Sequence, residues 1–365
     1  MTKFKCFTLY LLILFSYNKA MSLLIVRQKF NLIILTLFLS FILLSCGDNE
    51  DSSSEVVSHV TLLVGTNNGL SISEDSGSTW ATRTTDDGLG ANQIYSIAYN
   101  NEIIFAATAA GLSYSSDNGE SWSSYTAKDM NLSSDSTDSF AVFSISLTGN
   151  TLLLGTGGGI ALSFDIGSSW EDAHTSPESP GDTALPSNTV PSVFIANDTI
   201  YAGTASGFAK FEEPFYTTLD TDDGLGDNTV NSIYVEDSTI LAGTNNGFSI
   251  STNNATSFRN KTTEDGLADN AVYFVSIIDD DMYAGTGGGI SVTSDKGSTW
   301  ENYTEDNGLP SNHINYIYSH NDILYAATLN GLAYSSDSAS SWKTYTKEEG
   351  LASNLIYSVF VFDTE

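Results

Sequence analysis

A five-residue pattern, [GA]-T-x-x-G, recurs seven times along the chain and constrains the fold more than any other feature. The copies occupy 65–69, 107–111, 155–159, 203–207, 243–247, 285–289 and 327–331. Their spacings of 42, 48, 48, 40, 42 and 42 residues match the period of a four-stranded propeller blade. The sequence therefore predicts seven units that pack on one another rather than one ordinary core.

One repeat shows how its strands are arranged. Segments 94–99 and 102–108 are rich in β-branched and aromatic residues and are separated by an Asn-Asn turn. The [GA]-T-x-x-G turn leads into 112–117, and a second turn leads into 121–126. We name these strands A, B, C and D. Because no stretch after residue 56 has helical periodicity, we predict an all-β chain.

The order of the strands predicts how the ring closes. The first repeat begins at strand B, near residue 60, whereas the chain ends on an A strand at 355–362. We predict one seven-bladed β-propeller of four-stranded blades, closed when the C-terminal strand completes the first blade. Such closure leaves no open sheet edge.

A second motif, S-x-D-x-G-x-[ST]-W, follows strand C. It occurs at 73–80, 115–122, 163–170 and 293–300, with weaker copies at 251–258 and 335–342, and the fourth repeat lacks it. These hairpins resemble Asp-box (BNR) propellers, a superfamily that includes sialidases, xyloglucan hydrolases, sortilin-type receptors and photosystem II assembly factors. We expect a structural role, because the Asp can accept turn amides and the Gly can adopt φ > 0. The residues concerned are Asp75, Gly77, Trp80, Asp117, Gly119, Trp122, Asp165, Gly167, Trp170, Asp295, Gly297 and Trp300.

The connections from strand D to strand A carry a third motif, an acidic pair followed by Gly-Leu. They resemble two-component regulator propellers. We expect each Leu (Leu89, Leu225, Leu267, Leu309, Leu351) to fill the gap between blades and the Asn three residues later to fix the turn. The acids are Asp86, Asp87, Asp222, Asp223, Glu264, Asp265, Glu305, Asp306, Glu348 and Glu349. A ring of solvated carboxylates is the preferred interpretation, and a calcium site is the alternative.

Two D–A connections, 126–139 and 171–188, are longer than the others and flank the third blade. Extra loop length is where a propeller places specificity. We therefore expect the ligand on the face of the B–C turns and D–A connections. The candidate contacts are Lys128, Asp129, Met130, His174, Glu178 and Asp182.

Charge and composition exclude several functions. The chain has 13 basic and 44 acidic residues, and five of the basic ones lie in the first 45 residues, so the remainder has a net charge of −36. Such a surface repels nucleic acid. Sialidases clamp their substrate with three arginines, whereas only Arg83 and Arg259 follow residue 45. The four histidines have no spacing typical of a metal site, so we expect no cofactor.

The N-terminal segment resembles a bacterial lipoprotein leader. Arg27 and Lys29 precede an apolar stretch at 30–45 that ends in Leu-Leu-Ser-Cys, a sequence similar to a lipobox with Cys46 as the lipidated residue. We expect a signal peptide at 1–45, with Met21 as an alternative start, a flexible acidic tether at 46–58 and the propeller at 59–365. The acidic tether resembles the signal that sends Bacteroidota lipoproteins to the outer face of the outer membrane.

These features favour a non-catalytic, monomeric, lipid-anchored binding or assembly module of the cell envelope, with protein or glycan as its ligand. The first alternative is a polysaccharide-active hydrolase or lyase, which would need paired carboxylates at a fixed separation. The second is the extracytoplasmic sensor of a two-component system, which the D–A loops suggest by resemblance.

Overall fold

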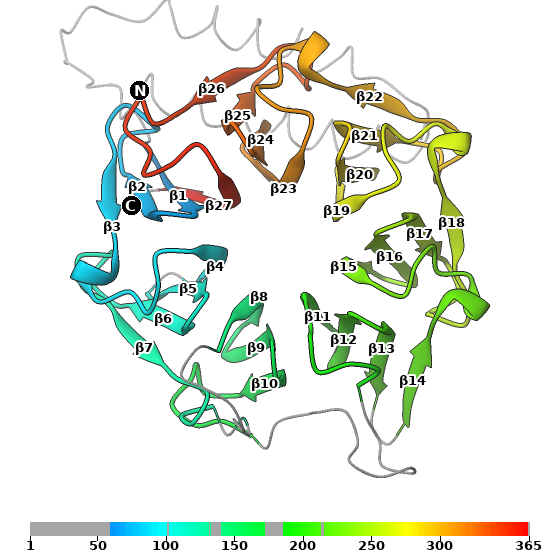
Figure 1. Ribbon diagram of the computed structural model, residues 1–365, viewed down its shortest axis with the longest axis horizontal. Coiled ribbons are helices and arrows are strands. Elements are labelled where there is room, and N and C mark those ends of the chain that lie inside the picture. Colours follow the sequence, from blue (N-terminus) through cyan, green and yellow to red (C-terminus); the bar gives the residue numbers. More distant parts are fainter. Residues whose placement is uncertain are drawn as a thin grey trace, which may run out of the picture. The chain divides into compact units, whose positions relative to one another are not determined.

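The computed structural model describes residues 59–100, 102–130, 132, 140–171, 185–212 and 215–363. These residues form seven antiparallel sheets arranged as blades around a centre (Figure 1). The predicted all-β, seven-bladed propeller is confirmed. Among the described residues no helix is long and apolar enough to cross a membrane.

Six blades show four strands, and the third shows three. The first three blades are β27 (Ile356–Asp363), β1 (Val60–Thr66), β2 (Gly69–Ser73), β3 (Ala81–Arg83); β4 (Ile94–Tyr99), β5 (Ile104–Thr108), β6 (Gly111–Ser115), β7 (Ser123–Tyr125); and β8 (Val142–Thr148), β9 (Thr151–Thr156), β10 (Gly159–Ser163). In the third blade the Glu171 amide donates to the Leu162 carbonyl at 2.9 Å, where a fourth strand would begin.

The other four blades follow the same order from the centre outward. They are β11 (Ser192–Ala196), β12 (Thr199–Thr204), β13 (Gly207–Glu212), β14 (Phe215–Leu219); β15 (Val230–Glu236), β16 (Thr239–Thr244), β17 (Gly247–Ser251), β18 (Arg259–Lys261); β19 (Val272–Ile278), β20 (Asp281–Thr286), β21 (Ile290–Thr293), β22 (Glu301–Tyr303); and β23 (Ile314–His320), β24 (Ile323–Thr328), β25 (Gly331–Ser335), β26 (Lys343–Tyr345).

The last strand closes the ring as expected. β27 pairs antiparallel with β1 along its whole length, from Val60 opposite Asp363 to Thr66 opposite Ile356. The first blade is therefore built from both ends of the propeller sequence, and β27 covers the edge of β1 (Figure 1).

The core is divided into seven apolar clusters, and each one lies between two neighbouring blades. Strands β2, β5, β10 and β17 are buried along their whole length, because a blade is packed on both faces. The five predicted leucines of the D–A connections all lie in these clusters, which confirms their role. Leu132 and Leu185 supply the same plug in the two long connections, so all seven junctions contain one.

The B–C turns owe their shape to a repeated threonine and glycine. In every blade the buried Thr Oγ1 donates to the carbonyl of the turn's last Gly, at 2.6 to 2.9 Å. That glycine has a positive φ, as at Gly69 with φ 124°. A Cβ on Gly69 would come within 2.5 Å of the Arg83 carbonyl oxygen, so only glycine fits there.

Candidate functional site

The acidic D–A connections build their own turns. Four of them form short 3-10 helices: η1 (Thr85–Asp87), η2 (Thr221–Asp223), η3 (Thr263–Asp265) and η4 (Glu305–Asn307). In the first, the Thr84 amide donates to Asp87 Oδ2 at 2.8 Å and the Asp86 amide donates to Thr84 Oγ1 at 3.3 Å, which is a capping box. The Thr85 amide donates to Asn92 Oδ1 at 2.8 Å. The predicted Asn thus fixes the turn, as do its counterparts Asn228, Asn270, Asn312 and Asn354.

This arrangement divides the acidic pairs into two kinds of side chain. Asp87, Asp223, Asp265 and Glu349 accept backbone amides of their own turns. Glu305 Oε1 likewise accepts the backbone amide of Asn312 at 3.2 Å. The remaining acids, Asp86, Asp222, Glu264, Asp306 and Glu348, are exposed, as are Asp223, Asp265 and Glu349 of the first kind. Across the described ranges, no three His, Cys, Asp or Glu residues come together in a way that could hold a metal ion. The calcium alternative therefore gains no support from these turns.

The residues of the S-x-D-x-G-x-[ST]-W motif, called the Asp box below, also stabilise their turns by hydrogen bonds. Asp117 Oδ1 accepts the Ser115 hydroxyl at 2.7 Å and the Ser121 amide at 3.0 Å, and the Gly119 amide donates to Ser115 Oγ at 2.8 Å. Hydrogen bonds of this kind, above all from the side chain at the fourth position after the Asp, lower the pKa of Asp75 and of Asp117 to about 2. In the fourth blade, which lacks the motif, Phe211 stands where the other blades have the first Ser or Thr of the motif.

Of the six candidate contacts expected on the two long connections, the structure describes Lys128, Asp129 and Met130. Lys128 and Asp129 are exposed. Asp129 Oδ2 accepts the Thr126 amide at 2.8 Å and the Thr126 hydroxyl at 2.7 Å, and these bonds lower the pKa of Asp129. It is thus the capping residue of a sixth turn of the same kind. His174, Glu178 and Asp182 lie outside the described residues.

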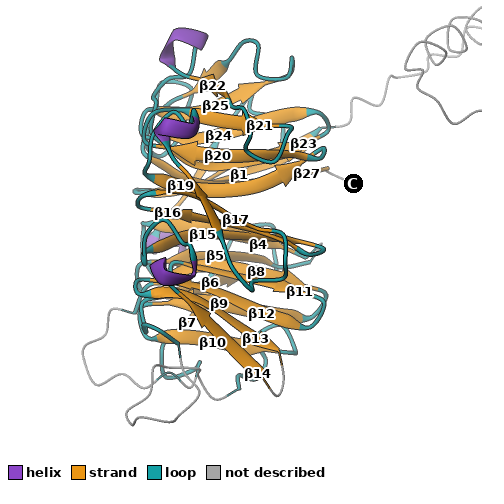
Figure 2. Ribbon diagram, turned by 90° about the vertical axis from the view of Figure 1, so that its right-hand side faces the viewer, coloured by secondary structure: helices purple, strands orange, loops and turns teal. Residues whose placement is uncertain are grey.

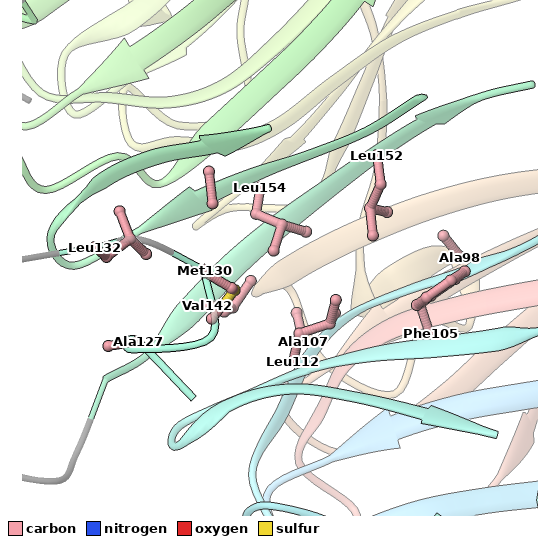
Figure 3. Close-up of a cluster of buried hydrophobic side chains, with 11 residues drawn as sticks. Ala98, Phe105, Ala107, Leu112, Ala127, Met130, Leu132, Val142, Leu152 and Leu154 are labelled. Carbon is pink, nitrogen blue, oxygen red and sulfur yellow. The ribbon is translucent and has the colours of Figure 1, made fainter. Parts of the chain in front are cut away.

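The predicted role of Met130 as a ligand contact needs correction. Its side chain is 0% exposed and packs with Val142 and Leu154 in the cluster between the second and third blades (Figure 3). It cannot contact a ligand there, and the prediction that it does is wrong. The reason is that Met130 follows the capping Asp129, at the point where the chain turns back into the gap between the blades.

A central channel of about 720 Å³ is lined by residues of all seven inner strands. Figure 1 shows these strands, β27, β4, β8, β11, β15, β19 and β23, arranged around the centre. In six blades the inner strand contains a β-bulge next to the B–C turn. A bulge turns one residue out of the ladder and re-aims its side chain. Pro191 occupies the matching place in the fourth blade. We call Pro191 and the six bulged residues the channel mouth, and all seven are half-buried. They are Tyr95, Phe143, Pro191, Asn231, Tyr273, Asn315 and Tyr357.

One side of the channel mouth is aromatic. The Tyr95 ring lies 5.6 Å from the Phe143 ring and 5.5 Å from the Tyr357 ring, tilted by 58° and 55°. Gln93 Nε2 donates to Tyr357 Oη at 2.9 Å. Burial raises the pKa of Tyr95, and the neighbouring Tyr357 adds to that rise. These rings form a continuous arc over the first three blades, in which each ring supports the next.

The facing side carries amides, a histidine and one more tyrosine. Asn231 Nδ2 donates to the Val272 carbonyl at 3.0 Å, and Asn315 Nδ2 donates to the Ile356 carbonyl at 2.7 Å. Since this bond orients the Asn315 amide, its Oδ1 faces His313 Nε2 at 3.1 Å, which must carry the proton. The His313 ring stacks on Tyr273 at 4.3 Å, and burial lowers the pKa of His313, which favours the neutral ring at neutral pH.

The channel differs in charge from the rest of the chain. Of its lining in the described part of the molecule, one residue is a carboxylate, Asp279, and none is lysine, arginine or histidine. Asp279 follows β19 at the A–B turn, which is the opposite end from the channel mouth. The helical turns of the D–A connections lie on one face of the propeller (Figure 2), the face on which the channel mouth opens.

Sequence reasoning missed the channel mouth, although a signal was present. A regular strand buries every second residue, but these inner strands place their branched residues three apart, as at Ile94 and Ile97 or Val142 and Ile145. A bulge places two residues of one strand opposite a single residue of its partner, which moves the next inward-facing position from the second to the third residue. The six candidate contacts expected from the sequence lie on the two long connections and include none of these residues.

Comparison with known proteins supports the architecture. No protein-family model and no curated protein sequence matches the chain. Among solved structures, the computationally designed Ika8 protein matches 81% of this chain and 89% of its own at 12% identity and a TM-score of 0.54. YCF48 bound to D1 peptide matches 70% of this chain and 82% of its own, at 16% identity and a TM-score of 0.51. These likenesses show the fold alone.

Proposed function

We propose that this protein is a non-catalytic binding module of the bacterial cell envelope that holds a protein or glycan ligand at the channel mouth. The observation that carries the proposal is the bulge repeated in six blades, which collects aromatic and amide side chains around one opening. Half-buried aromatic rings with a few fixed polar groups in a concave site are typical of ligand binding. A protein of similar fold, YCF48, is bound to D1 peptide in its solved structure, which supports a binding role for this chain.

The charge of the channel argues for binding without catalysis. Glycoside hydrolysis of the usual kind needs two carboxyl groups flanking the scissile bond. The described channel lining offers Asp279 alone, at the end opposite the channel mouth. Asp87, Asp223 and Asp265 in the D–A turns accept backbone amides of their own turns. For Asp265 the bond from the Thr262 amide also lowers the pKa, which makes it a poor proton donor.

The test uses the full chain, immobilised and incubated with solubilised envelope material. We expect the wild type to retain a component that the double variant Tyr95→Ala/Tyr357→Ala does not retain. Phe164→Ala is the matched control, because Phe164 is 59% exposed in the Asp-box turn of the opposite face. Equal retention by the double variant, at an unchanged unfolding midpoint, would contradict the proposal.

The long connections are part of the same proposal. We propose that residues 126–139 and 171–188 extend the binding surface beside the third blade. Replacing 173–184 by a short Gly-Ser turn should weaken retention in the same assay. If the replacement variant folds and retains the component fully, the loops do not contribute to binding. That result would leave the proposed binding at the channel mouth unaffected.

We also propose that Cys46 is the lipidated N-terminus of the mature protein, held at the outer membrane and exposed at the cell surface. Two or more acyl chains make such anchoring stable where one does not. Mass spectrometry of the N-terminal peptide decides the matter. An unmodified Cys46 within a longer peptide would refute the anchor without bearing on the channel mouth.

A further inference from the structure

The ligand class can be narrowed from the chemistry of the channel mouth, on the assumption that the proposed binding function holds. We infer that the channel mouth binds an uncharged saccharide chain. Three properties of the channel support this inference. Its lining carries little charge, an aromatic side of its mouth faces a side with amides, and backbone amides of its inner strands are already hydrogen-bonded.

Neutrality is the first property. In a chain with 44 acidic and 13 basic residues, a lining with one carboxylate is a marked exception. The exposed acids on this face, such as Asp86 and Glu264, lie in 3-10 turns that directly follow the outer strands, away from the centre. A basic partner would be recognised by acids that touch it, and none of the seven residues that define the channel mouth is an acid. Asp269, which acts electrostatically on His313 beside Tyr273, accepts the Ala271 amide of its own turn at 2.7 Å.

The second property is the division of the channel mouth into two kinds of surface. Tyr357, Tyr95 and Phe143 are tilted against one another and half-buried, so ring surface remains free for the apolar face of a sugar. Across the opening, Asn231 and Asn315 carry neutral amides whose Nδ2 donates to a carbonyl of the next blade. Each Oδ1 has two lone pairs, so it can accept a hydroxyl. A sugar hydroxyl both donates and accepts, so it suits amide and phenol groups of fixed orientation.

The third property concerns the inner strands, which are sheet edges facing the channel. An extended peptide commonly binds such an edge by adding a strand. Here the edge amides of Val193, Ile195 and Val275 donate to the serine hydroxyls of the preceding blade, Ser144, Ser146 and Ser232, at 3.0, 3.1 and 3.1 Å. The amide of Ile233 donates likewise to Ser192 at 2.9 Å. These bonds occupy amide donors on the inner strands of the fourth, fifth and sixth blades, so a peptide strand gains fewer backbone hydrogen bonds at those three edges.

The experiment is a binding survey with the purified full chain. The probes are a printed array of neutral oligosaccharides, an uncharged Gly-Ser-Tyr peptide and a polylysine peptide, and each binding probe is then titrated by calorimetry. We expect a neutral oligosaccharide to bind with an affinity that does not change between low and high salt, because no charge is screened. Tyr95→Ala and Tyr357→Ala should each weaken it about tenfold or more, which is about 1.4 kcal/mol. Phe164→Ala should leave it unchanged.

Three results would overturn the inference. They are no binding to any neutral saccharide of the array, binding of the polylysine or uncharged peptide in its place, or saccharide binding that survives in the folded double variant Tyr95→Ala/Tyr357→Ala. Folding is checked by the thermal midpoint of each variant. If the envelope component is still lost in the double variant while saccharides fail to bind, the binding function stands and the saccharide inference falls. If the double variant retains the envelope component, the binding function falls.

Discussion

The Tyr345 hydroxyl of the seventh blade donates a hydrogen bond of 3.2 Å to the backbone carbonyl of Ser76 in the first blade. The Tyr345 ring also stacks on Tyr334 at 4.7 Å and meets Trp80 edge-on at 5.4 Å. Ser76 has a φ of 58° within the Asp-box turn. The seven blades are therefore closed into a propeller at two places. The outer strand of the seventh blade meets the Asp-box turn of the first blade through these contacts, and β27 completes the first blade at the centre.

Replacing Tyr345 with Phe removes the hydrogen bond to the Ser76 carbonyl and keeps the aromatic side chain. We expect the free energy of unfolding to fall by about 1 kcal/mol, measured by chemical denaturation. Tyr216→Phe is the control, because Tyr216 is 41% exposed in β14 and should change stability by less than about 0.5 kcal/mol. Equal effects of the two substitutions would show that the contact with Ser76 does not stabilise the closure.

Deleting residues 355–365 should be far more damaging. It removes β27, leaves β1 as an open edge and exposes Leu62 and Val64, which are 1% and 0% exposed in the intact protein. We expect a clearly lower denaturant midpoint. Deleting 364–365 alone, beyond the end of β27, serves as the control. An unchanged midpoint after the longer deletion would rule out closure by β27.

The interblade leucines can be tested at Leu89, which is 3% exposed between the first and second blades. Leu89→Ala leaves a cavity in a junction that packs from both sides, so we expect a loss of about 2–5 kcal/mol. Leu329→Ala, at a leucine that is 45% exposed in a B–C turn, should cost less than about 0.5 kcal/mol. Denaturation of both variants in parallel decides the point, and a similar small loss for both would contradict the plug role.

Stability should fall steeply in acid. Hydrogen bonds hold the pKa of Asp75, Asp117 and Asp295 at about 2 in the folded protein, against about 4 for an unfolded Asp. A lowered folded pKa contributes stability that is fully present above the unfolded value and is lost as the pH falls through the folded value. We therefore expect the thermal midpoint to drop between about pH 4 and pH 2.

A variant separates the Asp boxes from the general effect of acid. Asp117→Asn removes one of these carboxylates, so its midpoint should be lower at neutral pH and should fall less between about pH 4 and pH 2. Glu120→Gln, at an exposed residue of the same turn, should follow the wild-type curve. Parallel curves for the wild type and Asp117→Asn would argue against a role of this carboxylate in acid stability.

Much of the fold could be predicted because its determinants are local. The turn threonine and glycine, the Asp-box Ser and Asp, and the plug leucine each act within a few residues of their own position. Read along the chain, they set the number of blades, the order of the strands and the need for the last strand to return. Leu132 and Leu185 escaped notice because their connections lack the Gly-Leu motif, although the junction needs the same plug.

The sequence by itself determined seven blades, the closure by 355–362 and the faces on which each turn lies. Only the tertiary structure decided what stands at the centre. Tyr95, Phe143 and Tyr357 come from three blades and meet because the ring closes and because a bulge re-aims each of them. Likewise Met130 and Asp129, adjacent in sequence, were separated into core and turn by the packing of two blades. Turns depend on neighbours in the chain, whereas a site at the axis depends on register and closure, which involve residues far apart.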